Sequence, residues 1–182
     1  MDPGIELNSA LNAFNGYIRA VDGTHITAHI PKKKQRPWFD RHSVVSQNVF
    51  ATVKMDLSFS YVLASVEGSI NDASLIAQAL GRSFQVPENR FYLADAGFGA
   101  RDGIVVPFPR IRYYQQDWRD ADVELTTRKE LYNKQHTGIR SVVERAFGLI
   151  KRKWRIVRKE TLEYSIQKQV QMIYTVTGLW NF

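Results

Sequence analysis

The stretch YIRAVDGTHITAHI, residues 17–30, gives the first indication of the fold. Its first part, residues 17–21, is rich in aromatic and β-branched side chains, which is typical of a buried strand. Asp22-Gly23 indicates the end of that strand, and strand-like sequence resumes over residues 25–30. The patterned part of the chain therefore begins with an extended segment that carries an acidic residue.

Two more extended segments follow. Residues 44–54 and 58–66 have the composition of strands, and a turn near Asp56 separates them. Together with the first segment they predict three consecutive antiparallel strands. A short helix is expected next, because Asn71 or Asp72 is a suitable N-cap and Gly81 a natural end.

The remainder of the chain has two short strand patterns and then becomes helical. Residues 91–94 form a compact apolar strand that ends at Asp95, and residues 103–107 predict another strand closed by proline. Helical patterns occupy residues 130–136, 139–157 and 165–180. This order predicts an α/β fold with a ribonuclease H-like mixed sheet flanked by helices. We expect one domain over residues 17–182, preceded by a lead-in of residues 1–16.

The charge of the chain is unevenly distributed. Residues 101–160 hold 15 of the 25 Lys and Arg but 8 of the 18 Asp and Glu, so this stretch accounts for the whole net charge of +7. Such a surplus is typical of a phosphate-binding surface, although a long solvated helix has the same composition. The chain has no cysteine and no stretch near the roughly 18 apolar residues of a membrane span, so we expect a soluble intracellular protein.

Three separated blocks each contain an acidic residue. They are VDGTHI at residues 21–26, LADAGF at 93–98 and VERAFGLIK at 143–151. They resemble, in this order, the Asp-Gly-Thr-His, Asp-Ser/Ala-Gly-Tyr/Phe and Val-Glu-Arg-x-Phe-Gly motifs of the Harbinger family of DDE transposases and the domesticated nucleases derived from it. Each motif alone is weak, whereas all three at this spacing are a strong signal.

Two minor blocks resemble the family less closely. EGSIND at residues 67–72 is similar to a Pro-Gly-Ser-x-His-Asp segment, with Glu67 and Asn71 in place of proline and histidine, and we do not assign Asp72 as a ligand. LWN at 179–181 is similar to a closing Leu-His-Asn. Such transposases usually carry a helix-turn-helix region upstream, so residues 1–16 are interpreted as the remnant of a missing region. In the domesticated relatives a Myb-like partner supplies DNA recognition.

The resemblance implies that Asp22, Asp95 and Glu144 form a catalytic triad that binds Mg²⁺ or Mn²⁺. Carboxylate oxygens are suitable ligands for these hard cations. Two such cations together stabilise both the attacking and the leaving oxygen in phosphodiester cleavage. Each residue also has a simpler explanation. Asp22 and Asp95 are common turn residues before glycine or alanine, and Glu144 can pair with Arg140 at i, i+4.

The helix over residues 139–157 predicts two distinct faces. At about 100° per residue, one face carries the glutamate among cations and a glycine that allows close approach of DNA: Arg140, Glu144, Gly148, Lys151 and Arg155. The adjoining face is apolar and comprises Val143, Phe147, Ile150 and Trp154. We therefore expect Arg140, Lys151 and Arg155 to contact DNA phosphates.

Other segments allow more than one interpretation. Lys32, Lys33 and Lys34 could bind phosphate, act as a nuclear-localisation signal or form a solvated loop. His25 and His29 would share one side of a strand, where structural roles are more common than zinc binding, and His25 could orient the Asp22 loop. The aromatic residues Tyr113, Tyr114 and Trp118 could stack on unpaired bases or pack in a core or interface.

Two hypotheses from different classes follow. The first is a divalent-metal-dependent DNA endonuclease or transposase core, in the nucleus and cytoplasm, acting on transposon ends as a monomer or a homo-oligomer. The second is a catalytically inactive, transposase-derived remnant that binds DNA or protein.

Overall fold

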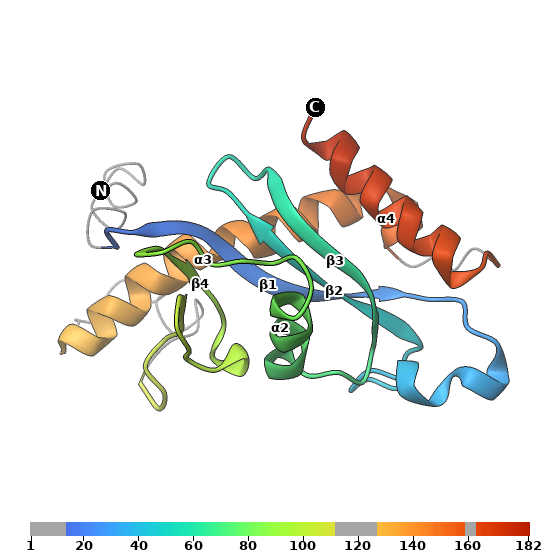
Figure 1. Cartoon of the computed structure of the whole chain (residues 1–182), viewed down its shortest axis with the longest axis horizontal. Coiled ribbons are helices and arrows are strands. Elements are labelled where there is room, and N and C mark those ends of the chain that lie inside the picture. The colour runs from blue at the N-terminus through green and yellow to red at the C-terminus, as the bar shows by residue number, and fades with distance from the viewer. Residues whose placement is uncertain (1–13, 112–126, 159–162) are drawn as a thin grey trace.

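A computed structural model describes residues 14–111, 127–158 and 163–182 (Figure 1). Its centre is a five-stranded sheet with the order β3-β2-β1-β4-β5. The antiparallel part consists of β1 (Tyr17–Thr27), β2 (Ser46–Val53) and β3 (Phe59–Glu67), while β4 (Phe91–Leu93) and β5 (Ile104–Val105) continue it in parallel with β1. The predicted ribonuclease H-like mixed sheet is confirmed.

Helices cover both faces of the sheet (Figure 1). One face packs on α2 (Asp72–Leu80), and the other on α3 (Arg128–Lys153) and α4 (Ile166–Trp180). Because strand side chains alternate between faces, Ala20 joins the core under α3 and its neighbour Val21 joins the core under α2. Short 3₁₀ turns complete the described elements: η1 (Lys32–Lys34), η2 (Arg36–Trp38), η3 (Ala96–Phe98) and η5 (Arg155–Val157).

Strand β1 is longer than the sequence predicts at Asp22-Gly23. It does not end there, because β2 pairs with it continuously from Ala20 to Thr27, with Asp22 opposite Ala51. The prediction of a strand end at Asp22 is therefore wrong. β1 stops at Thr27, so His29 lies beyond the strand and does not share its face with His25.

Helix α3 is a single helix of 26 residues, whereas the sequence predicts two helices over residues 130–136 and 139–157. Gly138 does not interrupt it, because buried side chains before and after that glycine hold the helix on the sheet. The helix begins with a capping box between Thr127 and Glu130 and ends at Lys153. Arg155 follows in η5, so it does not lie on the α3 face on which it was expected.

The ends of α2 match the sequence prediction. Asn71 is the N-cap, and its side-chain oxygen accepts a hydrogen bond of 2.9 Å from the Ser74 N–H. Gly81 is the C-cap. The core reaches slightly beyond the predicted start of the domain, since Phe14 is buried against Phe91 and Tyr132. In the described part of the chain, no helix combines the length and apolarity needed to cross a membrane.

Candidate active site

Strand periodicity places Asp22 beneath α3. Ala20 and Ile26 are buried in the core between the sheet and α3, and residues two apart on a strand share a face. Asp22 and Thr24 therefore point toward the same helix, and α3 supplies a cation to each. Arg140 pairs with Asp22, and Lys151 donates to Thr24.

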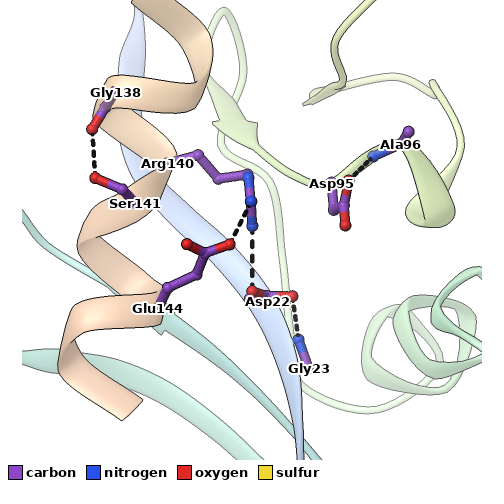
Figure 2. Close-up of polar contacts among 8 residues, drawn as sticks. All are labelled: Asp22, Gly23, Asp95, Ala96, Gly138, Arg140, Ser141 and Glu144. Atoms are coloured by element: carbon purple, nitrogen blue, oxygen red, sulfur yellow. Dashed lines mark hydrogen bonds and ion pairs between the residues drawn. The ribbon is translucent and has the colours of Figure 1, made fainter. Parts of the chain in front are cut away.

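Arg140 links two residues of the predicted triad (Figure 2). Its Nη1 lies 3.2 Å from Asp22 Oδ2, and its Nη2 donates to Glu144 Oε1. The side chain of Arg140 is 6% exposed, that of Asp22 19% and that of Glu144 48%. The guanidinium is thus an enclosed cation between a largely buried carboxylate and a more solvated one. The i, i+4 pair of Arg140 and Glu144 expected from the sequence is present.

The environment of Asp22 favours its protonated form. Burial raises its pKa to about 7, although the Arg140 charge and a 2.8 Å hydrogen bond from the Gly23 N–H oppose the shift. The charges of Glu144 and Asp95 raise it further. The three predicted carboxylates are therefore close enough to interact electrostatically, and the cations around Asp22 compensate its charge incompletely.

Asp95 lies just past the end of the neighbouring strand β4. In the parallel pair of β1 and β4, Ala20 is opposite Leu93, and Asp22 and Asp95 each follow two residues later. Asp95 is the N-cap of η3, and its carboxylate accepts from the Ala96 N–H. Figure 2 shows Asp95 on the sheet side of the site, opposite the α3 side chains.

The donor set fits a divalent cation by its chemistry. Carboxylate oxygens are the ligands that Mg²⁺ and Mn²⁺ prefer, and the raised pKa of Asp22 marks a buried anion with too little positive charge nearby. In this conformation, no three Asp, Glu or His side chains among residues 14–111, 127–158 and 163–182 are arranged to hold one ion. The guanidinium of Arg140 lies between Asp22 and Glu144 instead.

Asp72 is a further acidic residue beside the site. Asp72 is the first residue of α2, and its carboxylate lies against two glycines. Gly23 follows Asp22 directly, and Gly97 lies two residues after Asp95. A Cβ on Gly97 would come within 2.6 Å of Asp72 Oδ2, and one on Gly23 within 3.5 Å of Asp72 Oδ1. Burial and the charge of Asp95 raise the pKa of Asp72. The resemblance of residues 67–72 to a family segment could have indicated Asp72, but the differences at Glu67 and Asn71 argue against assigning it as a ligand from sequence.

His136 was also missed by the sequence interpretation. It is fully buried on α3, one turn before Arg140, and its Nε2 lies 3.2 Å from the Val105 carbonyl oxygen. Because a carbonyl can only accept, Nε2 carries the hydrogen. Burial lowers the pKa of His136 to about 4, so the ring is neutral near pH 7. Its position four residues before Arg140 and eight before Glu144 could have placed it on the same face of the helix.

Lys151 is turned toward β1. Its Nζ donates to Thr24 Oγ1 at 2.6 Å and to the His25 carbonyl at 2.9 Å, and burial lowers its pKa. Arg140 is likewise directed into the site and is buried, whereas a surface position facing DNA was expected. Both cations lie where the helix geometry predicted, on one face of α3, but their contacts in the structure are with the protein itself.

The other candidate DNA-binding residues are exposed. Lys32, Lys33 and Lys34 form η1, and Arg155 begins η5, all with solvent access. DNA contact by these residues stays a prediction.

The remaining side chains singled out in the sequence have other positions. His25 has its Nδ1 3.0 Å from the Ser46 hydroxyl, which in turn donates to Asp40, so its contacts are of the structural kind. Tyr113, Tyr114 and Trp118 lie outside the described residues.

The mixed sheet and its flanking helices define a ribonuclease H-like domain. The family model described as DDE superfamily endonuclease matches residues 21–181, most of the chain and all three triad positions. The chain therefore belongs to the DDE superfamily endonuclease family. No curated protein and no solved structure matches it.

Proposed function

We propose that this chain is the catalytic core of a divalent-metal-dependent DNA endonuclease of the Harbinger transposase type, which hydrolyses phosphodiester bonds at transposon ends. The observation that supports this most is that Asp22 on β1 and Asp95 each lie two residues past the paired residues Ala20 and Leu93, with Glu144 directed toward Asp22 from α3. The family match over residues 21–181 supports the same reaction class.

In this proposal the acidic residues have separate tasks. Asp22 and Asp95 would hold the divalent cations, and Glu144 would complete the ligand set from α3. The bound cations would polarise the phosphate and lower the pKa of the attacking water. Asp22, whose pKa is about 7 in the metal-free protein, would lose its proton as positive charge enters the site.

DNA binding in this proposal uses the exposed cations. Lys32, Lys33, Lys34 and Arg155 would contact phosphates, and the excess of positive charge over residues 101–160 would attract the polyanion. Arg140 and Lys151, which are turned toward β1, would contact phosphates after releasing Asp22 and Thr24. A Myb-like protein as the partner for sequence recognition, homo-oligomers and a location in the nucleus and cytoplasm belong to this proposal as well.

The test is cleavage of supercoiled plasmid carrying the element ends, in Mg²⁺ and in Mn²⁺. We expect nicking by the wild-type chain and a loss of more than about a hundredfold in Asp95→Asn, because a ligand carboxylate is removed. Asp102→Asn is the matched control, since Asp102 is an exposed aspartate on the following turn. Equal activity of wild type and Asp95→Asn, or activity that survives EDTA, would contradict the proposal.

The second candidate function is a non-catalytic DNA-binding protein. The observation that favours it is the ion pairing of both Asp22 and Glu144 with Arg140, which holds the two carboxylates in a metal-free arrangement. It predicts salt-dependent DNA binding that is unchanged in Asp95→Asn, with no nicking in either metal.

A further inference from the structure

The guanidinium of Arg140 occupies the space between two carboxylates of the candidate metal centre. Nη1 contacts Asp22 from β1, Nη2 contacts Glu144 from α3, and the side chain is 6% exposed (Figure 2). Arginine presents its donors in a planar fork, so it can bind two carboxylates at once.

The position of Arg140 is fixed from several directions. One turn earlier, His136 is bonded to the Val105 carbonyl of β5, and further along α3, Lys151 is bonded to Thr24 of β1. These contacts hold the face of α3 that carries Arg140 against the sheet. Since Arg140 is enclosed and Asp22 lies directly beneath it, its guanidinium has a defined place in the site.

A divalent cation and this guanidinium would compete for the same oxygens. Asp22 and Glu144 each use one oxygen for Arg140, and those oxygens face the space between the two side chains. Two cations held side by side at a largely buried carboxylate repel each other, because the low effective dielectric there screens them weakly. The contacts of Arg140 with both carboxylates therefore oppose binding of the metal.

We propose that Arg140 is a positioning residue that holds Asp22 and Glu144 together in the metal-free protein and competes with the divalent cation for them. This inference rests on the proposed function, since it requires that the carboxylates bind metal. It assigns Arg140 to control of metal loading, beyond the general attraction of DNA by positive charge. Lys151 does not share this role, because its ammonium is bonded to Thr24 and His25.

The experiment measures Mn²⁺ binding to the full chain by electron paramagnetic resonance of the free ion, at low salt and without DNA. We expect Arg140→Gln to bind Mn²⁺ roughly tenfold more tightly than wild type, because a competing cation at contact distance is removed. Arg145→Gln is the matched control, since it removes the same charge from an exposed position on the same helix. It should bind Mn²⁺ as the wild type does.

Thermal unfolding supplies an independent readout. In EDTA, Arg140→Gln should melt below wild type, because two carboxylates lose a shared partner, and Mn²⁺ should raise its Tm by more than it raises that of wild type. If Arg140→Gln does not fold, Arg140→Lys replaces it. Lysine keeps the charge without the planar fork, so a smaller gain of about threefold is expected.

The outcomes separate the inference from the function on which it rests. If wild type binds Mn²⁺ and the folded Arg140 variant binds it equally or more weakly, the competition alone is overturned. A gain in affinity of the same size in Arg145→Gln has the same meaning. Absence of Mn²⁺ binding in all variants overturns the metal-dependent function and the inference with it. Wild-type binding that is weakened by Asp95→Asn and strengthened by Arg140→Gln supports both.

Discussion

At the scale of a single residue, the carboxylate of Asp22 differs from that of an ordinary ion pair in its pKa. A carboxylate that pairs with arginine usually has a lowered pKa, yet burial raises that of Asp22 to about 7 despite the guanidinium 3.2 Å away. In the protein without metal, the Asp22 carboxyl group therefore holds its proton up to a pH of about 7.

The raised pKa of Asp22 predicts a pH-dependent stability. Between its ordinary value of 3.8 and about 7, the folded state holds a proton on Asp22 that the unfolded state has lost. The contribution of this group is therefore fully present below pH 4 and is lost as the pH rises through 7. In EDTA, we expect Asp22→Asn to raise the free energy of unfolding at pH 8 by a few kcal/mol and to have little effect near pH 4.

The measurement is chemical denaturation of wild type and Asp22→Asn at several pH values from 4 to 8. His136 contributes with the opposite sign, because burial lowers its pKa from 6.5 to about 4, so stability falls as acid protonates the unfolded chain. The difference between the two proteins removes that contribution, which is common to both. Parallel pH profiles for wild type and Asp22→Asn would show that Asp22 is not the group responsible.

At the scale of elements, α3 combines a structural face with a functional one. Its buried and half-buried polar side chains contact three other segments: the loop after β5 through Asn133, β5 through His136, and β1 through Arg140 and Lys151. The apolar side chains Val143, Phe147 and Ile150 bury the adjoining face, as the sequence pattern predicted. A single continuous helix therefore holds Glu144 over β1.

Two glycines of α3 allow a test of this dual use. A Cβ at Gly138 or Gly148 would meet nothing within 4 Å among the described residues, so alanine should raise the free energy of unfolding by about 0.5 to 1 kcal/mol at each position. Urea denaturation measures this gain. DNA binding should weaken several-fold in Gly148→Ala, where the sequence predicts close approach of the DNA backbone, and remain unchanged in Gly138→Ala.

Gly138→Ala serves as the control for helix stiffening in that comparison. Equal DNA affinity of Gly138→Ala and Gly148→Ala would show that the DNA backbone does not approach Gly148. A loss of stability at either position would mean that α3 is strained where it is described as regular.

At the scale of the whole molecule, the C-terminal residues join α4 to the start of β3. The Trp180 indole N–H donates to the Leu57 carbonyl at 2.8 Å. Asn181 binds the backbone of Phe59 twice, accepting from its N–H at 2.8 Å and donating to its carbonyl at 2.7 Å. These contacts connect residues 122 or 123 apart in the chain, so they tie the end of α4 to the start of β3.

Loss of this link should destabilise the entire domain. We expect Asn181→Ala to lower the free energy of unfolding by about 1 to 2 kcal/mol, because two hydrogen bonds to the strand backbone are removed. Phe182→Ala is the control, since Phe182 is fully exposed. Urea denaturation followed by circular dichroism measures the effect, and coincident midpoints for Asn181→Ala and Phe182→Ala would show that the link carries no stability.

The sequence by itself determined the order of strands and helices and the start of α2 to within one residue, and it supplied the three acidic positions of the proposed site. These features depend on local patterns, such as the strand-like composition of residues 44–54 or the spacing of 140 and 144, that act within one element. Only the tertiary structure decided that β1 continues through Asp22, because pairing with β2 outweighs the turn preference of Asp-Gly. It also decided that Asp72 borders the site and that Arg140 bridges two carboxylates. Those contacts depend on strand register and helix packing, since Arg140 meets Asp22 across 118 residues of sequence.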